Sequence, residues 1–265
     1  MTGLQKLWLA TLLGALIGLL GGLIGLGGAE FRLPILMAVF SLPTLEAIIL
    51  NKAMSLVVVI TSIFSRGFSV PMESLLPHWS IVVNLLIGSV VGAWYAAGYV
   101  MKLAPAMLNR VVFGLLIVLA LIMFWEHLVG FGETGAPLFQ QAWLQALVGI
   151  LAGLVVGIVA AVLGVAGGEL LIPIIVILWG IDIKTAGSLS LLVSLPTMLV
   201  GFFRYRQAQA FDALRRERDL LIWMSVGSIA GALVGGLLLG LVPAQWLGLF
   251  LAMLLLISAW KVFKH

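Results

Sequence analysis

The 265-residue sequence contains no cysteine, and charged residues make up only 9% of it. Without cysteine the chain has no disulfide, no thiolate metal site and no cysteine nucleophile. Hydrophobic residues account for 63% of the sequence, and the mean hydropathy is +1.26. In a soluble domain about a quarter of the residues are charged, because its surface is in contact with water. The surrounding solvent is therefore lipid, and the sequence predicts an α-helical integral membrane protein.

Other features are missing as well. No polar stretch is long enough for an extramembrane domain, the longest being Arg204 to Asp219. The chain has no GxxxxGK[ST] turn and no HExxH helix, and its three histidines lie near segment ends. We therefore expect no enzyme activity, no catalytic residue, no cofactor and no metal. The net charge of +4 lies in basic residues between apolar segments, so we expect the lipid bilayer as partner and no nucleic acid.

The two halves of the sequence match each other at an offset of 139 residues. GLGGAEFRLP at residues 25–34 falls on GVAGGELLIP at residues 164–173. At the same offset GSVVGA at residues 88–93 falls on GSIAGA at residues 227–232. Glycine matches are common between membrane segments, but the shared glutamate and proline are not. A duplicated half is the best explanation.

The duplication divides the chain into three parts. Residues 1–125 form a first membrane repeat, residues 126–140 an external linker, and residues 141–265 a second membrane repeat, all within one transmembrane domain. Each repeat contains five apolar segments, at about residues 4–27, 30–43, 50–65, 79–101 and 107–125, and 141–166, 168–181, 186–203, 220–241 and 244–263.

Two segments of each repeat are short for a membrane crossing. The second has only about a dozen residues and the third about sixteen to eighteen, whereas a straight crossing needs about 20. Short segments interrupted by glycine and proline at matching places predict broken or re-entrant helices around a substrate site. The expected fold is an all-α polytopic bundle of two homologous inverted repeats, with four to five membrane segments each.

The distribution of Lys and Arg predicts the orientation. With the N-terminus in the cytoplasm, eleven of the 14 basic residues fall inside, and only Arg32, Arg66 and Lys184 fall outside or at depth. This is the asymmetry that the positive-inside rule requires. An odd number of segments in each repeat makes the repeats inverted. We predict a multi-pass protein of the cytoplasmic membrane with both termini in the cytoplasm.

The paired glycine-rich turns followed by proline resemble the hallmark of the TauE/SafE sulfite-exporter family, also called the toluene-sulfonate uptake permeases. The resemblance covers nearly the whole chain. It implies secondary transport of small, often sulfur-containing anions across a bacterial cytoplasmic membrane. The chain departs from the family pattern at Ala29 and Ala166, within turns often written as three glycines. It also carries Glu30 and Glu169 where an apolar residue is common in the family.

The glycine-rich turns are the predicted binding site. They end one helix and begin another, so unpaired N–H groups of two half-helices would face one anion near the midplane. The alternative is that the glycines only permit tight helix packing. The predicted substrate-binding residues come from both repeats: Gly27, Gly28, Glu30, Asn51, Lys52, Ser55, Gly167, Gly168, Glu169, Ser190 and Ser194.

Glu30 and Glu169 are the two acids that the repeat places at matched depth. Ionisable groups at membrane depth mark pathways or proton relays, so we predict that both residues couple transport to protons. Arg32 near Glu30 would hold that carboxylate charged, and its repeat mate is Leu171. Glu169 is therefore the better proton carrier. The alternative role for both glutamates is to cap a helix N-terminus.

Lys52 and Arg32 are the candidate cations. Lys52 could reach a carboxylate or a substrate anion, but for both residues snorkelling to the interface is the favoured interpretation. The remaining polar candidates form matched stripes one helical turn apart, Asn51 with Ser55 and Ser190 with Ser194. Their alternative role is to hydrogen-bond across helices or to their own backbone.

The predicted function is secondary-active transport of small anions, such as sulfite, sulfonates or other organosulfur or carboxylate anions, with coupling to protons. The alternatives are an anion channel or a membrane-embedded scaffold without transport activity. The expected partners are the bilayer and a small anionic substrate. A homodimer is an open option.

Overall fold

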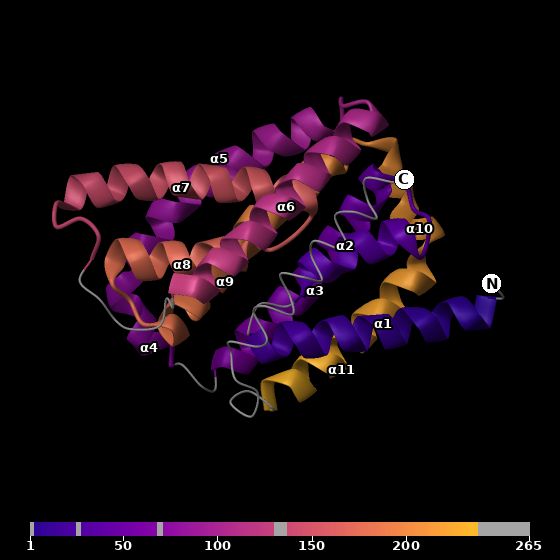
Figure 1. Ribbon diagram of the computed structural model, residues 1–265, viewed down its shortest axis with the longest axis horizontal. Helices are drawn as coiled ribbons and strands as arrows, with labels where there is room; N and C mark the ends of the chain where they lie inside the picture. Colours follow the sequence, from indigo (N-terminus) through magenta and orange to yellow (C-terminus); the bar gives the residue numbers. More distant parts are fainter. Residues whose placement is uncertain (1–2, 25–27, 68–70, 130–136, 238–265) are drawn as a thin grey trace.

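The computed structural model describes residues 3–24, 28–67, 71–129 and 137–237 (Figure 1). Within these ranges the chain is helical and contains no strand, which confirms the all-α prediction. The elements are α1 (Gly3–Ile24), α2 (Ala29–Ala38), α3 (Thr44–Gly67), α4 (Met72–Leu75), η1 (Leu76–His78), α5 (Trp79–Val100), α6 (Pro105–Val129), α7 (Ala142–Leu163), α8 (Gly168–Trp179), α9 (Ile183–Tyr205), η2 (Gln209–Asp212), α10 (Ala213–Arg216) and α11 (Arg218–Leu237). The predicted last segment, 244–263, lies outside the described residues.

Seven stretches of the described chain are long and apolar enough to cross a membrane. They are Gly3–Leu20, Thr44–Phe64, Glu73–Val100, Pro105–Ile122, Ala142–Leu163, Ile183–Tyr205 and Arg218–Gly235. The short second segments are confirmed, because α2 has 10 residues and α8 has 12. The short third segments are wrong, because α3 has 24 residues and α9 has 23. These helices include polar end residues, such as Glu46 in α3 and Arg204 in α9. A search for apolar runs omits such residues and therefore underestimates the helix length.

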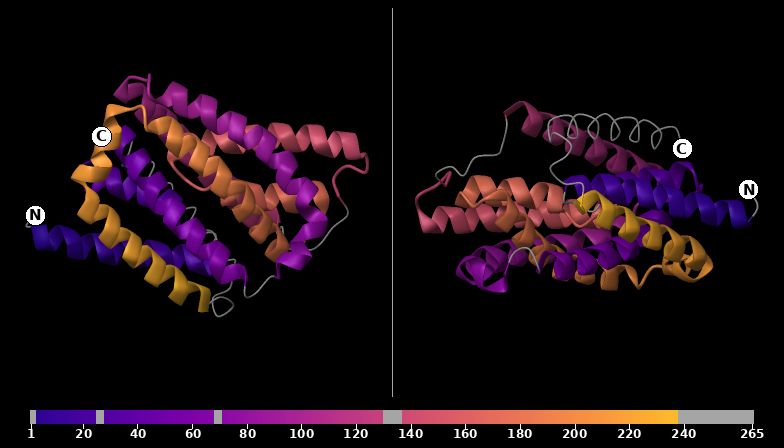
Figure 2. Two further views of the ribbon diagram at one scale, coloured as in Figure 1. Left: turned by 180° about the vertical axis from the view of Figure 1, so that it is seen from behind. Right: turned by 90° about the horizontal axis from the view of Figure 1, so that it is seen from below.

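Each repeat begins with a long helix that folds back into a short one. In the second repeat, Gln145 near the start of α7 donates to the carbonyl of Leu178 at the end of α8, at 3.3 Å. The hairpin of α7 and α8 therefore starts and finishes at the same end of the molecule. Figures 1 and 2 show that α1 and α7 run in opposite directions, as expected of inverted repeats.

The two repeats are interlocked by helix pairs. α1 packs along α11, and α5 packs along α7. Each pair therefore joins the first segment of one repeat to the fourth segment of the other. A Cβ atom at Gly18 would collide with the carbonyl oxygen of Ser228, and one at Gly157 with that of Ser89. The matched glycines of these helices thus serve close backbone packing.

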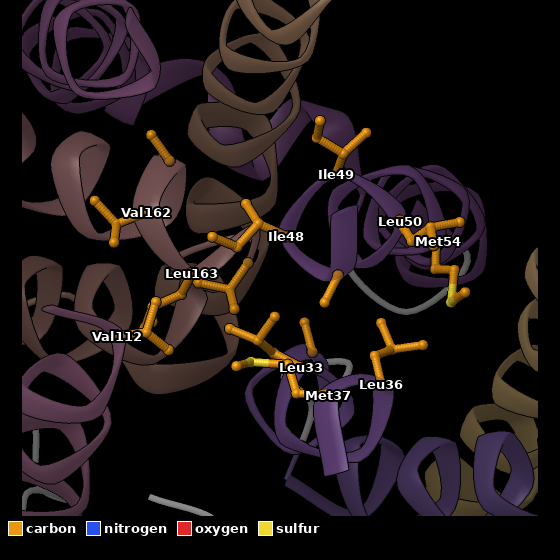
Figure 3. Close-up of a cluster of buried hydrophobic side chains, with 14 of the residues drawn as sticks. Leu33, Leu36, Met37, Ile48, Ile49, Leu50, Met54, Val112, Val162 and Leu163 are labelled. Atoms are coloured by element: carbon orange, nitrogen blue, oxygen red, sulfur yellow. The ribbon is translucent and has the colours of Figure 1, made fainter. Parts of the chain in front are cut away.

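A buried hydrophobic cluster fills the space beside the first hairpin (Figure 3). It joins Leu33 and Leu36 of α2 to Ile48 of α3, Val112 of α6 and Leu163 of α7. α3 and α9 pack against each other between the two hairpins. This packing fixes α2 and α8 against the central helices.

Ion pairs gather at one end of the bundle. Lys6 of α1 pairs with Glu217 at 2.6 Å, and Arg216 of α10 pairs with Glu46 of α3. The start of α1, the start of α3 and the segment between α9 and α11 therefore lie at the same end. The predicted topology assigns all three to the cytoplasm, and that assignment stays a prediction. Toward the other end, the carboxylate of Asp182 caps α9 by accepting from the Thr185 N–H, which lowers the pKa of Asp182.

Candidate substrate site

The two short helices begin at equivalent glycines. Gly28 precedes α2 with φ 67° and Gly167 precedes α8 with φ 80°, a left-handed conformation that glycine adopts without strain. Neither helix start has a side-chain cap, so the first N–H groups of both are left for other acceptors. Gly168 is the first residue of α8. Gly27 lies outside the described residues.

Glu30 and Glu169 meet at the centre of the molecule. Each is the second residue of its half-helix, and their side chains are only 2% and 7% exposed. The two carboxyl groups lie within hydrogen-bonding reach of each other, and the Glu30 side chain also reaches its own backbone N–H. Two carboxyl groups form a hydrogen bond only when one carries a proton. The site therefore brings together two acids that can hold a proton between them.

Arg32 is fully buried beside the first glutamate. Its Nη1 donates to Ser55 Oγ at 3.3 Å and to Asn51 Oδ1 at 3.5 Å, and its Nη2 donates to Ser228 Oγ at 3.3 Å. The expectation that Arg32 snorkels to the interface is wrong. Arg32 lies in the first turn of a helix that starts inside the bundle, and α3 and α11 enclose its side chain.

Lys52 is also fully buried, which again contradicts snorkelling. Its Nζ donates to the carbonyl oxygen of Ala160 at 3.1 Å and lies 6.0 Å from the centroid of the Tyr205 ring. The missing side chain of Gly201 makes room for the amine, because a Cβ there would lie 2.9 Å from Nζ. Tyr205, which the sequence did not single out, donates to the carbonyl oxygen of Ala161 at 3.1 Å.

Asn51 and Ser55 join the two hairpins. Asn51 Nδ2 donates to the carbonyl oxygens of Ala29 at 3.0 Å and Leu163 at 3.1 Å. Ser55 Oγ donates to the carbonyl oxygen of Gly164 at 3.5 Å. One stripe on α3 therefore holds the start of α2 against the end of α7, which gives these residues a positioning role at the predicted site.

The matching stripe on α9 is arranged differently. Ser190 Oγ donates to the carbonyl oxygen of Gly187 at 2.8 Å, within its own helix. Ser194 Oγ is buried and has no hydrogen-bond partner among the described residues. The hydroxyl groups of Ser89 and Thr197 hydrogen-bond across α5 and α9 at 2.7 Å. Of the predicted pair on α9, only Ser194 has a hydroxyl group without a hydrogen-bond partner among the described residues.

The site is chemically asymmetric although its backbone is repeated. At the 139-residue offset, Arg32 corresponds to Leu171 and Lys52 to Leu191. Leu171 is buried in an apolar cluster with Ile175 of α8. Both buried cations thus come from the first repeat, whereas each repeat contributes one glutamate. In the described part of the chain, no group of three or more His, Asp or Glu side chains is placed to hold a metal ion.

Comparison with known proteins finds one family. The model of the family described as "Sulfite exporter TauE/SafE" matches residues 2–123 and 148–265. These two segments correspond to the two repeats and span nearly the whole chain. No curated protein and no solved structure matches the chain.

Proposed function

The chain belongs to the sulfite exporter TauE/SafE family of membrane transporters, and we propose that it is a secondary-active transporter of small anions. The proposed substrates are sulfite, sulfonates and other organosulfur or carboxylate anions. The proposed coupling ion is the proton. We further propose a location in the cytoplasmic membrane with both termini in the cytoplasm, the orientation that the positive-inside rule favours.

The meeting of Glu30 and Glu169 between two half-helix starts is the observation that carries the proposal. Helix N-termini attract anions through their partial positive charge and their free N–H groups. Arg32 adds a buried cation beside Glu30, and Lys52 is a second buried cation, on α3. A centre with a buried arginine, two helix starts and two acids has the groups needed to bind an anion together with a proton.

The coupling step follows from the charges at the site. A bound anion repels a nearby carboxylate charge, so it favours the state in which the glutamate pair has taken up a proton. The anion and the proton then cross together, with less charge in the low-dielectric interior than the anion alone. Inverted repeats provide the movement, because rocking one half-bundle against the other exposes a central site to each side in turn.

The buried position of the site favours a carrier over a channel. A channel needs a continuous polar path, whereas the polar side chains of the site are buried. The third option, a scaffold, gives no role to buried cations. Ionisable groups at membrane depth are costly and are retained where they act on a substrate or an ion.

Uptake by reconstituted protein tests the proposal. We expect saturable uptake of sulfite, methanesulfonate or acetate that responds to a pH gradient. Flux that rises linearly with concentration would indicate a channel, and no flux at all a scaffold. Transport of a neutral sugar or a cation, with no anion competing, would reject the anion site.

A further inference from the structure

Within the described ranges, the buried guanidinium group of Arg32 has no ion-pair partner. The ion pairs among the described residues are Lys6 with Glu217 and Arg216 with Glu46, and neither involves Arg32. Glu30 attracts Arg32 electrostatically but forms no ion pair with it. Arg32 Nε is fully buried and has no hydrogen-bond partner among the described residues.

The contacts that Arg32 does make are weak. In all three, a guanidinium N–H group donates to a neutral oxygen at 3.3 to 3.5 Å, whereas charge-assisted N–H···O bonds are about 2.7–2.9 Å long. A buried cation held only in this way is expensive in a low-dielectric interior. These contacts fix the plane of the guanidinium group but leave donor capacity unused.

Lys52 differs from Arg32 in this respect. Its amine has a carbonyl acceptor at 3.1 Å and faces the ring of Tyr205, and both partners compensate part of its charge. No equivalent cation exists on the other side of the centre, because Leu171 and Leu191 occupy the matching positions. Arg32 is therefore the cation at this site with the most unsatisfied donor capacity.

We propose that Arg32 is the residue that binds the oxygen atoms of the transported anion, and that it holds this anion on the first-repeat side of the centre. This inference rests on the proposed function and specifies its substrate class. A planar guanidinium fork pairs with two oxygens of one group. The ligand is thus an oxyanion with at least two oxygens on one atom, such as a sulfonate, sulfite or carboxylate. A spherical halide cannot use both arms in this way.

The test compares the affinity of the purified full-length protein for methanesulfonate, acetate and chloride, measured by calorimetry. Arg32→Lys keeps the charge and removes the fork, and Arg32→Leu introduces the residue found at the repeat position. We expect Arg32→Lys to weaken methanesulfonate binding about 10-fold and Arg32→Leu at least that much, the loss typical of charge-assisted hydrogen bonds. The same changes at Arg206, an exposed residue, are the control and should leave binding unchanged.

Each outcome separates this inference from the proposed function. If the unmodified protein binds methanesulfonate and acetate and both Arg32 variants bind them equally well, Arg32 is structural and only this inference fails. If the unmodified protein binds no anion, the proposed function fails and this inference fails with it. If neither variant folds, the test is the rise in the melting temperature of the unmodified protein when each anion is added. Stronger protection by methanesulfonate than by chloride at equal concentration supports the fork, and equal protection contradicts it.

Discussion

Glu30 and Glu169 lie within hydrogen-bonding reach of each other although 139 residues separate them in the sequence. They come from equivalent positions in the first turns of α2 and α8. The duplication has thus produced a pair of acids at equivalent positions that interact with each other. A movement of one repeat against the other that changes this contact would link proton binding to conformation, as the proposed coupling requires.

Replacing Glu169 by Gln should remove the pH dependence of transport. In the unmodified protein we expect uptake to rise as the pH on the loading side falls, because the glutamate pair must take up a proton. Glu169→Gln mimics a permanently protonated side chain, so its transport should vary little with pH. Glu30→Gln is the matched variant. We expect it to retain more of the pH dependence, since Arg32 is two residues from Glu30 whereas Leu171 is at the matching position after Glu169. If Glu169→Gln keeps both the rate and the pH profile, Glu169 only caps its helix.

Alanine at Gly28 or Gly167 should weaken anion binding. Both glycines have positive φ, and an L-residue in this conformation costs about 1–2 kcal/mol. A Cβ at Gly28 would also lie 2.6 Å from the carbonyl oxygen of Ile17. The expected result is a several-fold loss of affinity for methanesulfonate together with a lower melting temperature. Gly114→Ala is the control, because Gly114 lies within α6, its φ is not positive, and a Cβ there meets nothing within 4 Å. Equal affinity in all three variants would show that the turns do not shape the site.

The ion pair of Arg216 with Glu46 should hold one end of the transporter closed. It joins the second repeat to the first, and the positions that match it at the other end are Pro77 and Thr185, which carry no charge. Exposed ion pairs are worth about 0–1 kcal/mol each, so reversing one charge should shift the population several-fold. Glu46→Arg should speed labelling from the cytoplasm of a cysteine placed at Ser194, and adding Arg216→Glu should reverse this. An unchanged labelling rate in Glu46→Arg contradicts the closing role.

The linker between the repeats should be external. The chain lacks cysteine, so single cysteines report their location without interference. A cysteine at Gly135, a sequence position outside the described residues, should react with an impermeant reagent added to intact cells. A cysteine at Gln207, which is exposed in the segment after α9, should react only after the cells are opened. The opposite pattern would show that the linker is cytoplasmic and that the ion-paired end of the bundle is external.

Much of the fold is visible in the sequence because lipid imposes simple rules. The length of apolar runs, the repeated Gly-Glu-Pro pattern and the distribution of Lys and Arg predicted the short α2 and α8 and the inverted arrangement. The full lengths of α3 and α9 could not be read in this way. Their polar end turns, with residues such as Glu46 and Arg204, are helical but interrupt the apolar run.

The site was harder to predict, because hydropathy describes a side chain and not its neighbours. Snorkelling is the common outcome for a lysine or arginine in a membrane protein. Lys52 stays inside because Ala160, Tyr205 and Gly201 provide an acceptor, an aromatic ring and room. The contact of Ser228 with Arg32 could not be predicted from the sequence either. Ser228 lies in α11, 196 residues from Arg32, yet its hydroxyl group accepts from that guanidinium.

Proton movement that accompanies methanesulfonate tests the central claim most directly. Methanesulfonate is the anion of a strong acid, so it carries no proton of its own near neutral pH, unlike sulfite. Proteoliposomes containing a pH-sensitive dye, with the membrane potential clamped, would receive methanesulfonate on the outside. The account predicts acidification of the interior that saturates with methanesulfonate and is absent in a variant with both Glu30→Gln and Glu169→Gln. Entry of methanesulfonate without acidification in the unmodified protein would contradict it.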